Sequence, residues 1–293
     1  METLAERVVV VTGAGRGLGR EHALLAAAEG AAVVVNDNGC VADGSGADPA
    51  VAAAVVAEIE ADGGRAVATT DDVATTAGAA ALLATALESF GRVDGLVNNA
   101  GVLRDRMFVN LDEDDWDAVI RGQLRATYCP AAAFARHWRA RSKEGEDVAA
   151  SMVNVPSTSG LIGQVGQTNY GAAKAAIASL TVILAEEIGR YGVRVNGVVP
   201  VARTRMTADV PAFAELFAAP ADPTEFDVYH PGNVSPLVAW LLRADCDVNG
   251  QVFYAKGGEI RRFLGWHYGA EATKDGRWEV EELDAAMAPL VSE

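Results

Sequence analysis

A tyrosine and a lysine stand four residues apart at the start of an expected helix. Tyr170 and Lys174 open a run of helix-forming residues that ends at Gly189. Side chains at positions i and i+4 lie on one face of a helix. A neighbouring ammonium group stabilises a phenolate and lowers the pKa of the tyrosine from its ordinary value of about 10. The pair could therefore move a proton near neutral pH, although this spacing alone is common on helices.

Ser157 precedes the pair and follows an expected strand over residues 149–155. In a parallel sheet, the carboxyl end of a strand lies beside the start of the next helix. Ser157 and Tyr170 could then bracket one carbonyl or hydroxyl oxygen. The run Asn98-Asn99-Ala100-Gly101 ends another expected strand in the same row, and its side chains could brace the neighbouring strand.

A glycine-rich turn joins the first expected strand to the first expected helix. It reads Thr12-Gly-Ala-Gly-Arg-Gly-Leu-Gly19, and its glycines permit a tight turn and close backbone approach. The N–H groups and the positive dipole end of a helix N-terminus suit a pyrophosphate. We therefore predict cofactor-binding positions at Gly13, Arg16, Gly17, Leu18 and Gly19. Leu18 stands where the last glycine of the common GxGxxG string would be.

An acidic residue ends the second expected strand. Asp37 could accept hydrogen bonds from the adenosine ribose and would repel a 2′-phosphate, which favours NAD over NADP. The alternative is an ordinary solvated loop aspartate. Arg16 points mildly the other way, because a cation in the turn could meet a 2′-phosphate.

Strands alternate with helices along the chain, which predicts an α/β, doubly wound, parallel sheet with helices on both faces. The irregular segments 161–169 and 201–231 follow strand ends, where such sheets bind ligands. We expect one domain over residues 1–260 and an extension over 261–293 that packs on it or at a subunit interface. The seven strands are expected over 8–12, 31–36, 65–69, 93–98, 149–155, 193–199 and 251–255, and the helices over 20–29, 49–61, 77–90, 116–141 with a kink at Pro130, and 170–189.

Composition excludes several classes of protein. A net charge of −16 repels nucleic acid and anionic membranes, so we expect neither as a partner. The three cysteines are far apart and the four histidines share no ligand spacing, so we expect no metal site and a reducing, cytoplasmic setting. No apolar run approaches the length of a membrane span, and the first residues do not read as a secretion signal.

Together the motifs resemble the classical short-chain dehydrogenase/reductase family. The likeness covers about residues 5–260 and rests on the glycine turn, Asp72-Val73, the Asn98–Gly101 run, Ser157-x12-Tyr170-x3-Lys174, and Asn196 with Pro200. Membership implies a seven-stranded Rossmann-type sheet and reversible NAD(P)-linked oxidation of an alcohol to a carbonyl. Within the family the chain looks most like the dehydrogenase unit of peroxisomal multifunctional enzyme type 2, a branch of (3R)-hydroxyacyl-CoA and 17-beta-hydroxysteroid dehydrogenases.

The resemblance also implies roles for single residues. Tyr170 would be the acid/base and would also contact the cofactor. Ser157 would hold the substrate oxygen, and Lys174 would lower the tyrosine pKa and bind the nicotinamide ribose. The remaining positions implied to bind cofactor are Asp72 and Val73 at the adenine, Asn99 with Ala100 and Gly101, and Pro200 with Thr204, which could touch the nicotinamide carboxamide.

Three positions depart from the family pattern. Gln123 stands where a catalytic asparagine is usual, Pro156 replaces a common serine, and Val201 follows Pro200 in place of a glycine. Gln123 could still hydrogen-bond a water, so we keep it as a candidate catalytic residue in a proton relay.

We therefore expect an NAD-dependent oxidoreductase that interconverts a secondary alcohol and a ketone. The expected substrate is a bulky apolar small molecule, such as a 3-hydroxyacyl-CoA or a steroid, and the expected assembly is a homodimer or homotetramer. One alternative is an NADPH-dependent ketoreductase of polyketide-type metabolism. Another, of a different class, is a non-catalytic dinucleotide-binding sensor or scaffold.

Overall fold

The computed structural model describes residues 3–204, 217–222 and 224–291. The chain divides into two compact units, residues 1–262 and 263–293. The larger unit holds the sheet, its covering helices and the pockets discussed below. The smaller unit contains a short 3-10 turn, η5 (Val280–Glu282), and the helix α11 (Leu283–Val291).

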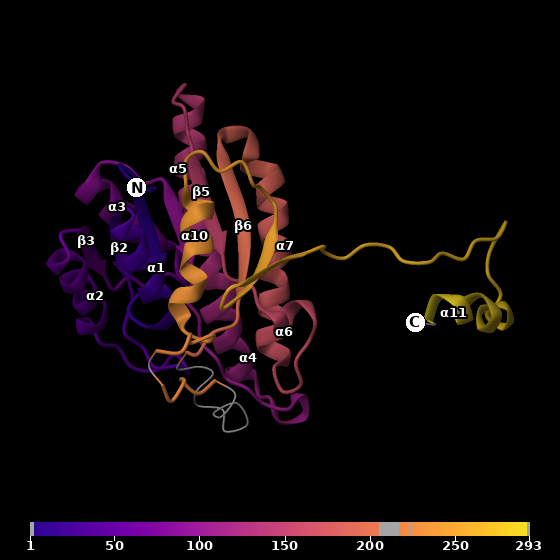
Figure 1. Cartoon of the computed structure of the whole chain (residues 1–293). Helices are drawn as coiled ribbons and strands as arrows, with labels where there is room; N and C mark the ends of the chain where they lie inside the picture. The colour runs from indigo at the N-terminus through magenta and orange to yellow at the C-terminus, as the bar shows by residue number, and fades with distance from the viewer. Residues whose placement is uncertain (1–2, 205–216, 223, 292–293) are drawn as a thin grey trace. The chain divides into compact units, whose positions relative to one another are not determined.

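A single sheet forms the centre of the larger unit, with the strand order β3-β2-β1-β4-β5-β6-β7-β8 (Figure 1). Neighbouring strands from β3 to β7 pair in parallel. The chain reverses its direction of travel across the sheet between β1 and β4, which is where doubly wound sheets open a ligand crevice. The strands are β1 (Val8–Thr12), β2 (Ala32–Asn36), β3 (Arg65–Thr69), β4 (Gly95–Asn98), β5 (Ala150–Asn154), β6 (Val193–Pro200), β7 (Val252–Lys256) and β8 (Glu259–Phe263).

The predicted fold class is confirmed, but the sheet has one strand more than the seven expected. The eighth strand, β8, follows β7 after only Gly257 and Gly258. A connection this short cannot make a parallel crossover, so β8 returns antiparallel to β7. Its sequence, Glu-Ile-Arg-Arg-Phe, lacks the apolar run that marked the buried strands, because most of β8 is exposed.

Helices cover both faces of the sheet. Alternate valines of β1 point to opposite sides: Val9 and Val11 join a core cluster with Ala23 and Ala26, whereas Val10 joins one with Phe134 and Trp138. The first cluster takes in α1 (Gly17–Ala28), α2 (Ala50–Ala61) and α10 (Ser235–Leu242), and the second α3 (Thr76–Phe90), α5 (Ala126–Lys143) and α7 (Thr168–Ile188).

The single helix expected over 116–141 is three segments. It begins earlier, at α4 (Glu113–Val119), because Asp112 accepts a hydrogen bond from the Asp115 backbone N–H at 2.7 Å and caps the helix. A π-helical segment, η2 (Ile120–Arg125), then leads into α5. The irregularity lies before Pro130 rather than at it. Pro130 has no backbone N–H to donate to the carbonyl of Ala126. Ala126 is the residue at which the π-helical segment ends and α5 begins.

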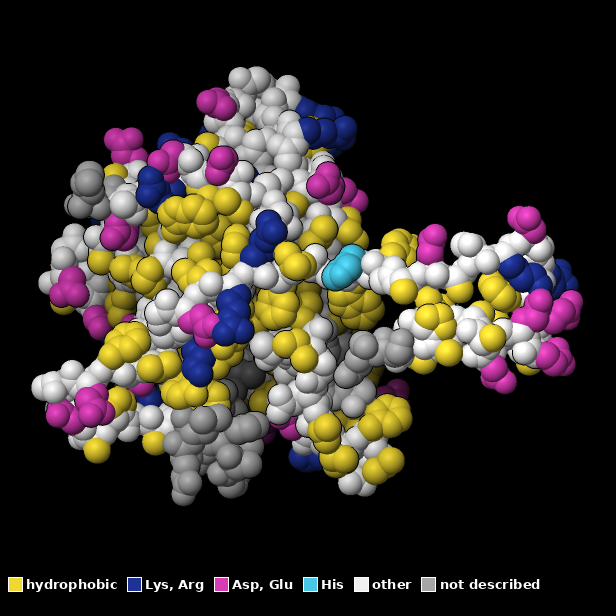
Figure 2. All heavy atoms as spheres, turned by 45° about the vertical axis from the view of Figure 1, so that its right-hand side comes forward, with side chains coloured by type: hydrophobic (Ala, Val, Ile, Leu, Met, Phe, Trp, Pro, Cys, Tyr) yellow, Lys and Arg dark blue, Asp and Glu magenta, His cyan; other side chains and the backbone are white. Residues whose placement is uncertain are grey.

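The surface carries both signs of charge. Figure 2 shows acidic and basic side chains interspersed on the visible face, with apolar areas between them. Within the described part of the chain, no helix combines the length and apolar character needed to cross a membrane.

Candidate active site and cofactor pocket

The glycine turn between β1 and α1 is held in place from β4. The Thr12 hydroxyl accepts hydrogen bonds from the backbone N–H groups of Asn99 and Ala100, each at 3.1 Å. The Asn99 side-chain amide donates to the backbone carbonyls of Thr12 and Gly13, each at 3.0 Å. Asn99 therefore braces the turn, a role that the sequence did not indicate.

Two glycines of the turn admit no side chain. Gly13 has φ +63°, and a Cβ there would lie 2.8 Å from the Ala100 Cα. A Cβ on Gly19 would lie 2.2 Å from the Gly13 carbonyl oxygen. Gly19 lines neither pocket described below, so its small size serves close packing rather than contact with a ligand. The helix α1 begins at Gly17, earlier than expected, so the turn leads directly into its free N–H groups.

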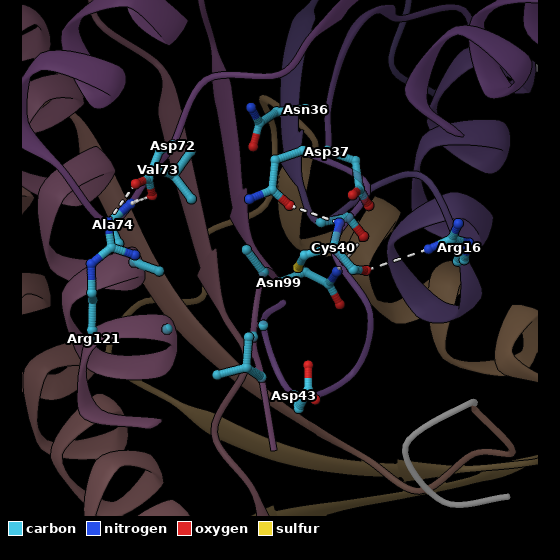
Figure 3. A pocket seen from close by; sticks show the side chains of 18 of the residues that line it. Arg16, Asn36, Asp37, Cys40, Asp43, Asp72, Val73, Ala74, Asn99 and Arg121 are labelled. Carbon is cyan, nitrogen blue, oxygen red and sulfur yellow. Dashed lines mark hydrogen bonds and ion pairs between the residues drawn. The ribbon is translucent and has the colours of Figure 1, made fainter. Parts of the chain in front are cut away.

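A cavity of about 300 Å³ opens beside this turn, at the carboxyl ends of β1, β2 and β4 (Figure 3). Its walls come from the glycine turn, the end of β2, the loop after β3 and the loop after β4. The predicted cofactor residues that line it are Gly13, Arg16, Gly17, Leu18, Asp37, Asp72, Val73, Asn99, Ala100, Gly101 and Thr204.

Asp37 is fixed at the end of β2 by backbone donors. Its carboxylate accepts hydrogen bonds from the N–H groups of Gly15 at 2.9 Å and Gly39 at 2.7 Å. Asp37 is therefore not an ordinary solvated loop aspartate. The carboxylate is held against the glycine turn, on the wall of the cavity.

Asp72 lies on another wall of the same cavity. One carboxylate oxygen accepts from the Ala74 backbone N–H at 3.0 Å, and the other pairs with the guanidinium of Arg121 (Figure 3). Arg121 comes from the π-helical segment, and no sequence pattern marked it.

The loop over residues 39–48 supplies a wall that sequence reasoning left unassigned. Cys40, Asp43 and Gly44 line the cavity. The loop is tied to the segment after β4, because the Leu103 N–H donates to the Ala42 carbonyl at 2.9 Å and Arg104 donates to the Asp43 carbonyl at 3.0 Å. Its position after a strand end was the available signal.

A second cavity, of about 320 Å³, continues from the first. The two share Leu18, Asn99, Gly101 and Thr204 on their walls. The second brings together the proposed catalytic groups Gln123, Ser157, Tyr170 and Lys174, with Pro200 beside them. The residues on its walls that were not predicted are Leu103, Val155, Pro156, Thr158, Ser159, Gln164, Gln167, Val201, Ala202 and Phe217.

Lys174 and Tyr170 lie together on α7, as their spacing required. The Lys174 ammonium nitrogen donates to the Val155 carbonyl at 2.6 Å and lies 5.5 Å from the centroid of the Tyr170 ring. Burial lowers the pKa of Lys174 to about 7. Tyr170 as a residue is half-buried, but its hydroxyl is enclosed, and burial raises its pKa to about 12. The pKa of Tyr170 is therefore raised by burial, and not lowered as its spacing from Lys174 suggested.

Ser157 begins the short helix α6 (Thr158–Leu161) and accepts a hydrogen bond from the Ser159 N–H at 3.2 Å. Its hydroxyl also hydrogen-bonds the Tyr170 phenol, which opposes the effect of burial on the pKa of that phenol. The serine and the tyrosine therefore meet, although they come from different elements.

Gln123 lies in the π-helical segment and is buried at 1% exposure. Its side-chain amide donates to the Val102 carbonyl at 2.7 Å, and its Oε1 has no partner among the described residues. A Cβ on Gly101 would lie 2.6 Å from that side chain, so Gln123 packs directly on the turn after β4.

Behind the site, a row of buried polar side chains joins β4, β5 and α7. The Asn98 amide donates to Asn154 at 2.9 Å, and the Asn154 amide donates to the Thr181 hydroxyl at 2.9 Å. Asn98 thus braces the neighbouring strand, as expected.

These observations fit a bound nicotinamide dinucleotide. Gly13 and Gly17 present backbone to the cavity, the helix N-terminus that begins at Gly17 lies on its wall, and the joined cavities lead from Asp37 to Tyr170. Over residues 3–204, 217–222 and 224–291, no group of three or more His, Cys, Asp and Glu side chains could hold a metal ion.

Comparison with known proteins agrees with this fold and site. Residues 7–214 match the short chain dehydrogenase family. A solved structure of a short chain dehydrogenase from Mycobacterium avium superposes with a TM-score of 0.85 at 46% identity, covering 99% of this chain and 94% of that one. Hydroxyacyl-CoA dehydrogenase ChsB1 of Mycobacterium tuberculosis is 42% identical over 289 residues, which cover 97% of this chain and 88% of that protein.

Peroxisomal multifunctional enzyme type 2 of Mus musculus is 40% identical over 260 residues, which cover 89% of this chain but only 33% of that larger protein. The chain belongs to the short-chain dehydrogenase family, and the expected family is confirmed. It is an oxidoreductase that acts on CH–OH groups with a nicotinamide dinucleotide.

Proposed function

We propose that this enzyme is an NAD-dependent dehydrogenase of a bulky, apolar secondary alcohol, with 3-hydroxyacyl thioesters as the first substrate class to test. The observation that carries the proposal is the pair of joined cavities. One contains a glycine turn and a fixed Asp37, and the other contains Ser157, Tyr170 and Lys174.

The proposed chemistry assigns one task to each side chain. NAD, held by the glycine turn and Asp37, would supply the acceptor for the hydride of the carbinol carbon. Ser157 donates a hydrogen bond to the substrate oxygen, and Tyr170 takes the hydroxyl proton. Burial, which raises the pKa of Tyr170 to about 12, keeps the phenol protonated near neutral pH, whereas only the phenolate can take the proton. A positive charge on Lys174 would stabilise the phenolate, and the lysine pKa of about 7 lets it gain that charge near neutral pH.

The preference for NAD rests on Asp37. Two backbone N–H groups hold its carboxylate on the cavity wall, where a 2′-phosphate would meet a fixed negative charge. We expect a higher kcat/KM with NAD than with NADP. Asp37→Ser should raise kcat/KM with NADP and so reduce the ratio of the NAD value to the NADP value. A clear preference of the unmodified enzyme for NADP would contradict the assignment.

One observation favours the second candidate, an NADPH-dependent ketoreductase. Arg16 lies on the cavity wall, on the opposite side of the view in Figure 3 from Asp72, and its guanidinium donates to the Cys40 carbonyl at 3.4 Å. The 2′-phosphate of NADPH could compete with the Cys40 carbonyl for that guanidinium. Initial rates in both directions with all four nicotinamide cofactors separate the two candidates.

The substrate class rests on the second cavity. Apolar side chains from three segments line it, among them Leu103, Val155 and Phe217, and a related protein is named a hydroxyacyl-CoA dehydrogenase. The test is a panel of (3R)-hydroxyacyl-CoAs, hydroxysteroids and polyketide alcohols. Turnover confined to small polar alcohols would contradict the proposal.

A further inference from the structure

A chain of polar side chains connects Ser157 to Asp105, and none of its members lines the cofactor cavity. The Ser157 hydroxyl lies 3.4 Å from that of Ser159, which donates to Gln167 Oε1 at 2.6 Å. The Gln167 amide in turn donates to the Asp105 carboxylate at 2.7 Å. The chain therefore runs from a proposed catalytic hydroxyl to a charged group that the reaction does not otherwise use.

The elements that carry this chain are fixed to one another. The Arg106 N–H donates to the Gly166 carbonyl at 3.0 Å, and the Asn169 side chain donates to the Arg104 carbonyl at 3.0 Å, so Asp105 is held from both sides. On α6, a Cβ at Gly160 would lie 2.4 Å from the Ala175 backbone nitrogen, so α6 and α7 are in close contact. The distances along the chain are thus set by the backbone rather than by free side chains.

We propose that Asp105 is a positioning residue for the reaction and that it acts through Gln167 and Ser159 to orient the Ser157 hydroxyl. This inference rests on the proposed function, since it gives Ser157 its role there.

The direction of each hydrogen bond follows from the charge at the far end. An ionised carboxylate only accepts, so the NH₂ group of Gln167 must face Asp105. The amide oxygen then faces Ser159, whose hydroxyl must donate to it. Ser157 accepts from the Ser159 backbone N–H at 3.2 Å and donates to the Ser159 hydroxyl oxygen at 3.4 Å, because the Ser159 hydrogen is committed to Gln167. This long contact orients the Ser157 hydroxyl, and its hydrogen can turn to a substrate oxygen as acceptor in place of Ser159.

The charge on Asp105 also reaches Tyr170. One oxygen of the carboxylate is buried and has no partner among the described residues. Its negative charge raises the pKa of Tyr170, after burial itself. Burial raises the pKa of Asp105, and Gln167 and Arg106 oppose that rise. Of the other charged groups nearby, Arg104 and Arg106 pair with Asp115 at 3.6 Å and 3.5 Å, and the Lys174 ammonium nitrogen lies 5.5 Å from the centroid of the Tyr170 ring.

The test compares Ser159→Ala, Asp105→Asn and the control Asp117→Asn in the full-length enzyme. Asp117 is an exposed carboxylate on α4, outside the polar chain, and its substitution makes the same change of charge. The assay follows oxidation of (3R)-hydroxydecanoyl-CoA by NAD across a pH series. Thermal unfolding and NAD binding show that each variant is folded.

We expect Ser159→Ala to lower kcat by roughly ten-fold, the effect of one lost orienting hydrogen bond, with KM nearly unchanged. Asp105→Asn should lower kcat less, because an asparagine oxygen can still accept from Gln167. Asp105→Asn should also move the Tyr170 limb of the pH–kcat/KM profile to lower pH, whereas Ser159→Ala and Asp117→Asn leave it in place. Wild-type kcat in both Ser159→Ala and Asp105→Asn, with no movement of that limb, overturns the proposal. Tyr170→Phe in parallel separates the two claims: if it stays active, the proposed function itself fails.

Discussion

The hydrogen-bonded row of buried side chains, Asn98, Asn154 and Thr181, allows an estimate of how much one substitution lowers the free energy of unfolding. Asn154 is fully buried, and replacing it with alanine removes its two hydrogen bonds, each 2.9 Å long. The Asn98 amide would lose its partner, and its own oxygen already has none among the described residues. Two bonds at about 1 kcal/mol each, plus about 1–3 kcal/mol for the orphaned amide, predict that Asn154→Ala lowers the free energy of unfolding by about 3–5 kcal/mol.

The assay is urea denaturation followed by tryptophan fluorescence at one protein concentration. Thr181→Val keeps the side-chain volume but removes the acceptor for Asn154, so alone it should lose about 1–2 kcal/mol and, in the Asn154→Ala background, clearly less. Asn110→Ala, at an exposed asparagine, is the control. If Asn154→Ala lies within about 1 kcal/mol of the Asn110 control, the row does not bind β4, β5 and α7 together in the way the distances imply.

Three further predictions follow from single side chains. Gly19→Ala should weaken NAD binding strongly, because the alanine Cβ would lie 2.2 Å from the Gly13 carbonyl oxygen. A wild-type Kd for NAD, measured by calorimetric titration of the variant, would contradict this. Gln123→Ala should lower kcat less than Tyr170→Phe does, and unchanged kcat would exclude Gln123 from a proton relay. Burial lowers the pKa of His22 from 6.5 to about 3, so the unfolded chain takes up a proton that the folded one refuses. The contribution of His22 to the free energy of unfolding should be complete above pH 6.5 and fall by about 1.4 kcal/mol per pH unit towards pH 3. His22→Gln should therefore make the free energy of unfolding depend less steeply on pH in acid denaturation.

The sequence was sufficient to predict the parts of the fold that local chemistry dictates. Short β-branched runs such as Val8–Thr12 and the Gly-rich turn after it can form little else than a buried strand followed by a helix N-terminus. The last strand, β8, was missed because an exposed hairpin partner carries no apolar run. The π-helical segment at Gln123 was missed because one extra residue in a helical turn leaves the apolar pattern almost unchanged.

Side-chain contacts across the sheet were harder to predict. That Tyr170 and Lys174 share a helix face follows from spacing alone. That Asn99 braces the glycine turn, or that Asp105 reaches Ser157 through Gln167, depends on how distant segments dock. The pKa of Tyr170 shows the same limit, because its direction depends on burial, which spacing does not reveal.

The most direct test of the account is the substitution Tyr170→Phe, measured with paired assays of NAD binding and alcohol oxidation. Loss of one hydroxyl leaves the glycine turn, Asp37 and Lys174 in place, so NAD should bind with wild-type affinity. Turnover should fall by about 100-fold or more, because the group that takes the proton is gone. Turnover near the wild-type rate, with NAD still bound, would show that the proton moves through another group and that the proposed centre is wrong.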